Sequence, residues 1–238
     1  MGFVDLHSHV LPGIDDGAQD LDESMALLRG LAELGFEEVH ATPHQKYPSY
    51  FPSFEQMRQA REAVGDAAPV RLSMAAENFW DAVLFERMPD LSFPRYQPTR
   101  QAFLFEVMPQ AMPPQIEEHL FRLRVRGVLP VMAHPERYVA VQQNLSRAES
   151  LGRSAALVVD LGALAGAHGD EACRASRALV ERGLAHAAAS DIHHRKDLAE
   201  VSAGIAWLKK KTGQAGVKRL LEDGPRSILA GQIPEAEE

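Results

Sequence analysis

Imidazole and carboxylate side chains recur in this sequence where short apolar runs end. Two pairs have the same spacing, with one residue between their members: His7 with His9, and Asp191 with His193. Side chains two positions apart on a strand point to the same face, so each pair can bind one metal ion. One pair alone has simpler interpretations, such as polar residues at a strand end or a helix cap by Asp191. Two such pairs in one chain favour metal binding.

Five further side chains follow short apolar runs in the same way. They are Asp16, His44, Glu77, Glu106 and His134. A carboxylate at the end of a buried strand needs a metal ion or an arginine beside it, because burying it unpaired is costly. A lone histidine there is more often structural, and the Asp-Asp-Gly run around Asp16 is by itself typical of a turn. Together with the two pairs, these residues predict a pocket for several divalent ions, which generate hydroxide and bind phosphate.

Other polar residues near these runs have weaker assignments. Arg137, three residues after His134, can bind two phosphate oxygens or form a surface salt bridge. Asp160 ends an apolar run and is a candidate ligand support or substrate contact. The loop at 45–52 carries aromatic side chains that either face a ring-bearing substrate or cover the core, and the second is favoured. His186 is expected to be structural or to support a ligand. The remaining histidines are expected on the surface or on helices: His40, His119, His168 and His194.

Apolar runs alternate with helix-period segments, which predicts a parallel α/β fold. Strands are expected at residues 3–7, 39–42, 70–76, 102–107, 129–133, 156–160 and 184–190. Helices are expected at residues 22–34, 53–64, 114–126, 141–151, 170–182, 198–211 and 215–222. Seven strands favour a distorted (β/α)7 TIM-like barrel over an open doubly wound sheet. In such a barrel the metal site lies at the C-terminal ends of the strands, where the candidate ligands fall.

Bulk properties limit the class of protein. The 238 residues fit one domain spanning 1–238, with 230–238 as a frayed tail, and the 45% apolar content suffices for a full core. The net charge of −8 argues against long nucleic acids as partners. The lone Cys173 excludes an internal disulfide and is expected on the buried face of a helix. Neither a signal peptide nor a membrane-length apolar stretch is found, so a cytoplasmic protein without membrane insertion is expected.

The motifs as a set resemble those of the polymerase-and-histidinol-phosphatase (PHP) superfamily. More narrowly, they are similar to the manganese-dependent protein-tyrosine phosphatases encoded with bacterial capsule and exopolysaccharide genes. The matching strings are DLHSH at 5–9, LPGIDDG at 11–17, TPH at 42–44, AE at 76–77, FE at 105–106, AHPERY at 133–138, ASDIH at 189–193 and PRSIL at 225–229. The resemblance covers nearly the whole chain, and the spaced set is far more specific than any one string.

The resemblance implies a distorted (β/α)7 barrel with three divalent ions, Mn²⁺ first among candidates that include Fe, Zn and Mg. The implied ligands of the first ion are His7, His9, Glu77 and Asp191. Those of the second are Glu77, Glu106 and His134, and those of the third are Asp16, His44 and His193. Arg137 matches the phosphate-binding arginine of these enzymes. Two features depart from their pattern: Asp160, where relatives carry an amide or hydroxyl residue, and the loop at 45–53, which is less basic.

The resemblance also implies the activity, a phosphomonoesterase that uses metal-activated hydroxide. The expected substrate is a phosphotyrosine-bearing protein, the tail of a bacterial tyrosine autokinase of capsule or exopolysaccharide synthesis. Arg137, Asp191 and His193 are the candidate catalytic residues, with the general acid open between Asp191, His193 and a water molecule. The alternatives are a histidinol-phosphate or other small-molecule phosphatase, and a non-catalytic phosphoprotein- or metal-binding protein. The sequence is compatible with a homo-oligomer.

A cysteine-dependent tyrosine phosphatase is excluded by the sequence itself. That chemistry needs an arginine six residues after the nucleophilic cysteine, and the residue six after Cys173 is Leu179. An amidohydrolase also begins with a His-x-His strand, but it usually adds a lysine at a strand end, and no lysine is placed that way here. The metal-dependent phosphatase is therefore the preferred interpretation.

Overall fold

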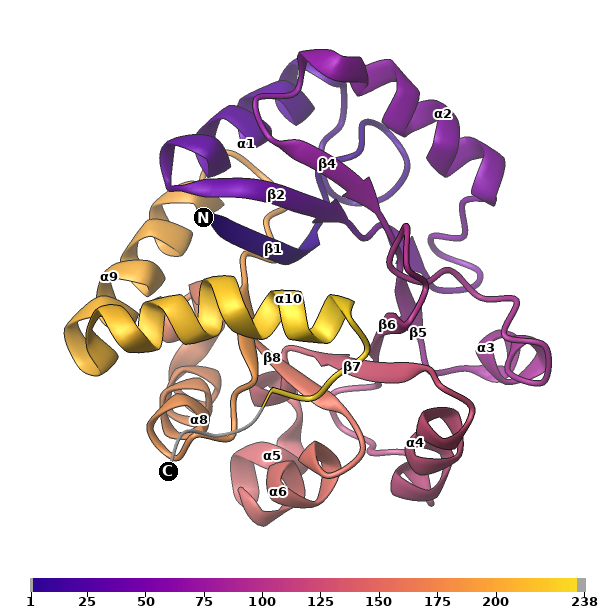
Figure 1. The fold of residues 1–238 in the computed structure, drawn as a ribbon, viewed down its shortest axis with the longest axis vertical. Coiled ribbons are helices and arrows are strands. Elements are labelled where there is room, and N and C mark those ends of the chain that lie inside the picture. The colour runs from indigo at the N-terminus through magenta and orange to yellow at the C-terminus, as the bar shows by residue number, and fades with distance from the viewer. Residues whose placement is uncertain (1, 235–238) are drawn as a thin grey trace.

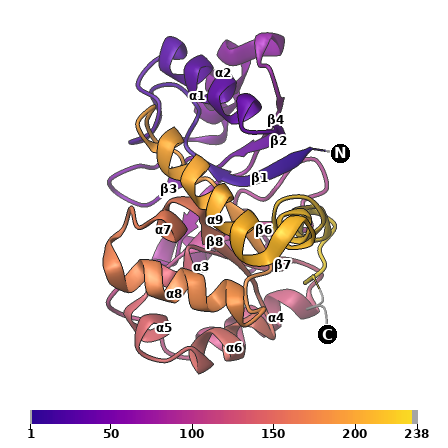
Figure 2. The same ribbon diagram turned by 90° about the vertical axis from the view of Figure 1, so that its left-hand side faces the viewer.

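The computed structural model describes residues 2–234 as strands flanked by helices (Figures 1 and 2). The strands are β1 (Phe3–Ser8), β2 (Phe36–Ala41), β3 (His44–Gln45), β4 (Arg71–Met74), β5 (Glu77–Phe79), β6 (Ala102–Glu106), β7 (Leu129–Ala133), β8 (Ala156–Asp160) and β9 (Ala187–Ala189). The helices are α1 (Leu21–Glu33), α2 (Phe54–Val64), α3 (Ala82–Arg87), α4 (Ile116–Val125), α5 (Val139–Gln143), α6 (Ser146–Gly152), α7 (Leu161–Ala165), α8 (Gly169–Glu181), α9 (Asp197–Lys218) and α10 (Gly224–Leu229).

The strands pair in parallel and form two sheets, in the orders β1-β2-β4 and β3-β5-β6-β7-β8-β9. This confirms the predicted parallel α/β class. Short breaks separate β2 from β3 and β4 from β5, and the pairing of His44 with Glu77 resumes the ladder after them. Glu77 N donates to Pro43 O at 3.1 Å, and at the other edge Asp191 N donates to His7 O at 2.8 Å. Backbone hydrogen bonds therefore connect the two sheets on both sides.

Alternation along the strands divides the core into two apolar clusters. Phe103 and Phe105 of β6 belong to the larger cluster, which also includes residues of the surrounding helices. Leu104, between them, belongs to a smaller cluster that draws residues from both sheets and is rich in alanine. Tyr96 lies fully buried in that smaller cluster, and its hydroxyl donates to Leu6 O at 2.8 Å. One face of each strand thus meets helices, while the other meets strands of the opposite sheet.

Side-chain caps define the starts of α1 and α2. Asp20 caps α1 by accepting a hydrogen bond from Glu23 N at 2.8 Å. Ser53 and Gln56 form the capping box at the start of α2. These caps fix where each helix leaves the loop before it. The loops in question carry Asp16 and the aromatic residues after His44.

Some predicted boundaries differ from the structure. Residues 141–151 form two helices, α5 and α6, because Asn144 leaves the helix and its side chain accepts a hydrogen bond from Ser146 N. The helix α3 was not predicted. The predicted helices at 198–211 and 215–222 meet at Gly213, whose φ of 67° bends α9. The second continues through a π turn (Arg219–Asp223) to α10.

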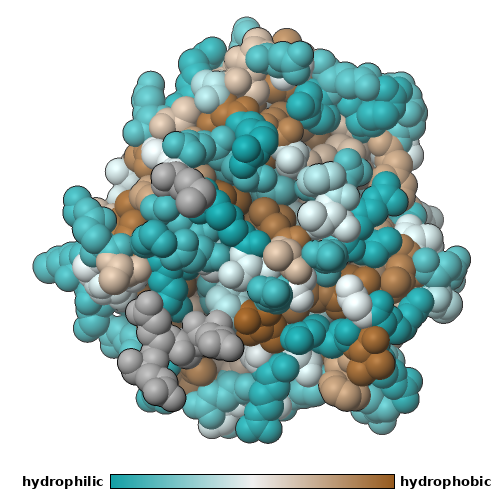
Figure 3. Space-filling model, viewed as in Figure 1, coloured by the Kyte–Doolittle hydropathy of each residue, from teal (hydrophilic) through white to brown (hydrophobic). Residues whose placement is uncertain are grey.

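The surface and the chain end agree with the bulk properties. Figure 3 shows a face on which hydrophilic residues predominate and hydrophobic ones are scattered between them. Within residues 2–234, no helix combines the length and the apolar content needed to cross a bilayer. Ala230 N and Gly231 N donate to carbonyl groups of α10, so the start of the expected 230–238 tail closes that helix. Residues 235–238 of that tail lie outside the described part.

His186 has a structural role that makes folding stability depend on pH. Its Nδ1 accepts a hydrogen bond from Leu157 N at 2.9 Å. Burial, and then the charge of Arg219, lower the pKa of His186 to about 4. An unfolded histidine has a pKa near 6.5, so protonation favours the unfolded chain. The stability that neutral His186 contributes is present above about pH 6.5 and is lost as pH falls toward 4.

A His186→Gln variant should therefore show a weaker pH dependence of stability than the wild type. Between pH 7 and pH 5, the wild-type free energy of unfolding should fall by roughly 1 kcal/mol more than that of the variant. Urea unfolding at both pH values measures this difference. Because the loss from pH 7 to pH 5 is taken within each protein, any change in stability that the substitution causes at pH 7 cancels. Equal losses in the two proteins would show that His186 is not the titrating group.

Candidate metal centre

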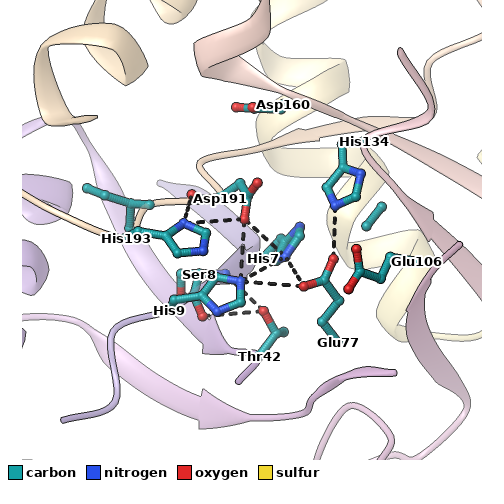
Figure 4. A network of polar contacts seen from close by, with 12 residues as sticks. His7, Ser8, His9, Thr42, Glu77, Glu106, His134, Asp160, Asp191 and His193 are labelled. Atoms are coloured by element: carbon teal, nitrogen blue, oxygen red, sulfur yellow. Dashed lines mark hydrogen bonds and ion pairs between the residues drawn. The ribbon is translucent and has the colours of Figure 1, made fainter. Parts of the chain in front are cut away.

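The structure brings all of the predicted ligand side chains into one cluster. Figure 4 labels most of them: His7, His9, Glu77, Glu106, His134, Asp191 and His193. Their ligand atoms form overlapping groups in which all atoms lie within 4.8 Å of one another. These groups are His9, Asp16, His44 and His193; His7, His134 and Asp191; His7, His9 and Glu77; and His44, Glu77 and Glu106. The side chains come from seven separate parts of the chain: His7 and Glu106 lie within β1 and β6, His44 and Glu77 begin β3 and β5, and the others lie in loops after strands. Their convergence matches the expectation that the ends of parallel strands meet at one edge.

Two of these imidazoles lie close both to each other and to two carboxylates. His7 Nε2 lies 3.2 Å from His9 Nε2, 3.4 Å from Glu77 Oε2 and 3.2 Å from Asp191 Oδ1. His9 Nε2 lies 3.6 Å from the same Glu77 oxygen and 3.4 Å from the same Asp191 oxygen. Ligands about 2.1 Å from a tetrahedral ion are roughly 3.4 Å apart, so the spacing fits a bound cation.

A second part of the cluster lies on the more exposed side of His9. Asp16 Oδ1 lies 3.4 Å from His44 Nε2 and 3.6 Å from His193 Nε2. The ring of His193 stacks on the ring of His9, with centroids 4.0 Å apart. Asp16 reaches this position because the Asp-Asp-Gly turn folds back on His9. A Cβ at Gly17 would lie only 2.0 Å from His9 O, so the turn requires glycine there.

The third part of the cluster surrounds Glu77 on its other side. His134 Nε2 lies 2.9 Å from Glu77 Oε1, and His44 Nδ1 lies 3.5 Å from Glu106 Oε1. Burial would raise the pKa of Glu77, but the imidazoles of His7 and His44 hold it well below its usual range. Burial and the charge of Glu77 raise the pKa of Glu106 to about 7. Two neighbouring carboxylates thus compete for positive charge, which a cation would supply.

Strained backbone aims two of these side chains. His134 and Asp191 directly follow or lie just beyond β7 and β9, and their φ angles are 34° and 47°. The left-handed conformation is unfavourable for residues other than glycine and tends to persist at functional sites. It turns each side chain out of the strand direction and into the cluster.

Unpaired buried atoms provide an independent test of whether a metal ion fits. Among the described residues, ten buried side-chain atoms make no hydrogen bond of good geometry. Five of the ten belong to candidate ligands: Asp16 Oδ1, His44 Nδ1, Glu77 Oε2, Glu106 Oε1 and His134 Nδ1. Buried polar atoms normally have partners, and histidine nitrogens with carboxylate oxygens form the mixed donor set that divalent transition metals accept. The residues present therefore fit a metal centre.

Arg137 lies beside the cluster rather than on a surface salt bridge. Its Nη2 donates to Asp160 Oδ2 at 2.6 Å and to Asp191 Oδ2 at 2.5 Å, and both carboxylates are buried. Asp160 is held in turn, because its Oδ1 accepts a hydrogen bond from Gly162 N at 2.7 Å. Glu136 Oε1 accepts one from Asp160 N at 2.9 Å. This network positions the guanidinium at the edge of the candidate metal site.

The sequence profile of the family described as "Capsular polysaccharide synthesis, CpsB/CapC" matches residues 3–230. The chain belongs to this family. The chain is 26% identical to the tyrosine-protein phosphatase CpsB of Streptococcus pneumoniae, over 97% of this chain and all of that relative. It is 29% identical to the tyrosine-protein phosphatase YwqE of Bacillus subtilis, over 82% of this chain and 78% of that relative.

Solved structures agree with this membership. A crystal structure from work on YwqE and CpsB, described as unique metal-dependent tyrosine phosphatases, superposes with a TM-score of 0.86. The two sequences are 26% identical, and the superposition covers 98% of this chain and 97% of the chain in that structure. A prolidase structure has a TM-score of 0.55 at 14% identity and shares the fold alone. The predicted resemblance to capsule-locus phosphatases of the PHP superfamily is thereby confirmed.

In this CpsB/CapC-family chain, sequence reasoning missed the partner of His9. Asp15 Oδ2 lies 2.7 Å from His9 Nδ1. Burial would lower the pKa of His9, but the Asp15 carboxylate raises it to about 10. A carboxylate on the far nitrogen of a ligand histidine fixes the ring and increases its basicity. The sequence did contain a signal, because Asp15 is a second carboxylate next to Asp16. The run was interpreted only as a turn.

One expectation for the remaining histidines is wrong: His40 is 1% exposed within β2, where its Nε2 lies 3.0 Å from Glu38 Oε1. His168 lies on the surface as expected, but it also contacts the network of Arg137: its Nε2 lies 2.6 Å from Asp160 Oδ2 and 2.8 Å from Arg137 Nη2. Alternation along the strand explains His40, because its side chain points inward. No local pattern marks His168.

The loop after His44 covers one edge of the cluster. The ring of Tyr50 stacks on His44 with centroids 5.9 Å apart, and Lys46 Nζ lies 3.6 Å from Glu106 Oε1. Gln45 Nε2 donates to Pro52 O at 2.7 Å, which closes the loop on itself. Tyr47 is 65% exposed. The loop therefore shields the site with one aromatic side chain and presents another to solvent.

A cavity of about 250 Å³ opens beside the cluster. Its walls include Asp16, Arg137, Asp160, His168, Asp191 and His193. It is lined by candidate metal ligands on one side and by the Arg137 network on the other. A small anionic group entering it would meet both.

Proposed function

We propose that this chain is a metal-dependent phosphatase that removes phosphate from protein tyrosine residues in capsule or exopolysaccharide synthesis. The observation that carries the proposal is the close approach of His7 and His9 to Glu77 and Asp191, with Arg137 hydrogen-bonded to Asp191. The names of the relatives as tyrosine-protein phosphatases support the substrate class.

The proposed centre holds three divalent ions, with Mn²⁺ as the first candidate. His7, His9, Glu77 and Asp191 would hold one ion, since both imidazoles lie near both carboxylates. Glu77, Glu106 and His134 would hold the second, with His134 2.9 Å from Glu77, and Asp16, His44 and His193 would hold the third. When bound, such ions lower the pKa of water and offset the charge of a phosphoryl group. The protein itself must hold the ligand side chains in position. Asp15 does this for His9, because its carboxylate lies at hydrogen-bond distance from the far ring nitrogen.

Arg137 binds the phosphoryl group in this proposal. Its Nη2 already bonds two carboxylate oxygens, which shows that oxygen acceptors fit there. Its Nε is buried and makes no hydrogen bond of good geometry with the described residues. A planar guanidinium can bind two oxygens and stabilise the charge that the transition state spreads over them. Asp191 and His193 border this position as ligands and orient the group that reacts.

We extend the proposal to the architecture and to the partner. The two sheets would act as one distorted (β/α)7 barrel, in which β2 with β3 and β4 with β5 each count as one interrupted strand. The shared inner cluster and the hydrogen bonds at both sheet edges support this view. The proposed partner is the phosphotyrosine-bearing tail of a bacterial tyrosine kinase, since an extended tail can present its side chain to an open cavity.

Elemental analysis of the purified protein, paired with a substrate panel, tests the function. The panel consists of a phosphotyrosine peptide, histidinol phosphate and an oligonucleotide. We expect bound transition metal and preferential hydrolysis of the phosphotyrosine peptide. Preference for histidinol phosphate would assign the site to small-molecule substrates instead. Metal without any hydrolysis would indicate a binding protein.

Removal of metal should lower both stability and activity. The cluster brings buried carboxylates and imidazoles together, so ions that bind only the folded protein stabilise it by mass action. Treatment with a chelator should lower the unfolding temperature by several degrees and abolish hydrolysis, and Mn²⁺ should restore both. Differential scanning calorimetry with and without added Mn²⁺ measures the shift. An unfolding temperature that ignores chelation and added metal would contradict the metal centre.

A further inference from the structure

His168 lies at the mouth of the cavity on a short turn between α7 and α8. Gly166 and Gly169, with φ angles of 101° and 86°, bracket it and allow the chain to reverse over the cavity. The side chain is 38% exposed, so the imidazole reaches both the cavity and solvent. It belongs to none of the groups of candidate metal ligands. The contacts of His168 are instead with the residues that hold Arg137.

The contacts of His168 place one ring nitrogen next to the phosphate-binding position. Its Nε2 lies 2.8 Å from Arg137 Nη2, and both nitrogens lie 2.6 Å from Asp160 Oδ2. One carboxylate oxygen is thus bound by two neighbouring nitrogens. An oxygen of a phosphoester bound at Arg137 Nη2 would also lie within reach of His168 Nε2. The arrangement suits a group that exchanges a proton with a substrate oxygen.

Asp160 provides the means to keep that imidazole in place. It is 3% exposed and is fixed by hydrogen bonds through both its backbone and Oδ1, which leaves Oδ2 for His168 and Arg137. A buried carboxylate beside an imidazole orients the ring. Asp191 and His193, which we assign as metal ligands, use their lone pairs for the ion. That leaves the proton to be supplied by a water molecule or by another side chain.

We propose that His168 donates the proton that the leaving oxygen of the substrate takes up, and that Asp160 positions His168 for this step. This inference rests on the proposed phosphatase function. As the bond between phosphorus and the tyrosine oxygen breaks, both electrons stay with that oxygen. The Nε2 proton of His168 then converts it to a phenol. Water supplies the new oxygen on phosphorus and releases a proton to solvent. Solvent reprotonates His168, so the net reaction consumes one water molecule.

The dependence of rate on the leaving group tests this role. Phenol and tyrosine have a pKa near 10, so departure of their anions is faster when the leaving oxygen is protonated. The p-nitrophenolate anion is a much weaker base and leaves readily without a proton. In a His168→Asn variant, turnover of phenyl phosphate and of a phosphotyrosine peptide should fall by about tenfold to a hundredfold. Turnover of p-nitrophenyl phosphate should fall by less than about threefold, because little acid catalysis is lost with that substrate. Asp160→Asn, which keeps the cap on Gly162, should shift the ratio of rates in the same direction.

Measurements other than turnover separate proton donation from a structural role. Metal content, unfolding temperature and affinity for inorganic phosphate, measured by calorimetry, should match the wild type in His168→Asn. His194→Asn is the matched control, because His194 borders the same cavity but lies 3.5 Å from Glu23. It should leave the ratio of rates unchanged.

Two outcomes would overturn the role of His168. One is an equal loss with both kinds of ester, with or without weaker phosphate binding. The other is no loss with either ester. If the metal-loaded wild type hydrolyses neither ester, the proposed function and this inference fail together. If the wild type hydrolyses both and the ratio stays constant in His168→Asn, the inference alone fails.

Discussion

A Glu77→Gln variant should purify with much less than half of the wild-type metal and lose at least about a hundredfold in turnover. Glu77 is central to the cluster, because its Oε2 faces His7 and His9 while its Oε1 lies 2.9 Å from His134. A neutral amide keeps the shape but removes the charge that balances the ions. Elemental analysis and assays with phosphotyrosine peptide measure the two effects.

An exposed glutamate provides the control for this substitution. Glu118 on α4 is exposed and pairs with Arg122, so Glu118→Gln should leave metal content and turnover unchanged. A Glu77→Gln protein with wild-type metal content and rate would remove Glu77 from the centre. It would also remove the main reason for placing one ion on each side of that carboxylate.

Arg137→Ala should retain bound metal but lose at least about a hundredfold in kcat/KM. The guanidinium is the cationic side chain placed beside Asp191 at the cavity, and its loss leaves the phosphoryl charge without a hydrogen-bond donor there. Arg137→Lys should recover only part of the loss, because an ammonium group cannot bind two oxygens in one plane. Steady-state kinetics with p-nitrophenyl phosphate measure both variants.

The control for Arg137 is an arginine with an ordinary surface partner. Arg147 on α6 lies 2.8 Å from Glu117, and Arg147→Ala should keep the wild-type rate. Hydrolysis near the wild-type rate by fully metal-loaded Arg137→Ala would contradict a phosphate-binding role. Loss of metal from that variant would show that Arg137 acts by holding Asp191.

The clustering of the candidate ligands could be predicted because it depends on a simple property of parallel sheets. His7, Glu77 and Asp191 each stand where an apolar run stops, and such ends meet at one edge of the fold. The helix caps at Asp20 and Ser53 were equally predictable, since capping depends on residues three apart. Whether these side chains hold metal is a separate, chemical question that the experiments above address.

The supporting residues could not be predicted, because their roles depend on contacts between distant segments. Asp15 looks like part of a turn until the turn is seen to fold onto His9. His168 is 31 residues from Arg137, and its approach depends on two glycine conformations that have no periodic signature. The interruption of two strands also escaped prediction, since an apolar run gives no sign of where pairing pauses.

Those interruptions have a further consequence for how the protein tolerates change. The pauses between β2 and β3 and between β4 and β5 fall directly before His44 and Glu77, and pairing resumes with these two residues opposite each other. Each pause acts as a spacer that sets which way the next side chain points. Deleting one residue from either spacer would shift the following strand by one position. The side chains of that strand would then point to the opposite face, and the ligand would point toward the helices. Insertions and deletions should therefore be far rarer in these dipeptides than in the nearby loops, whatever residues occupy them.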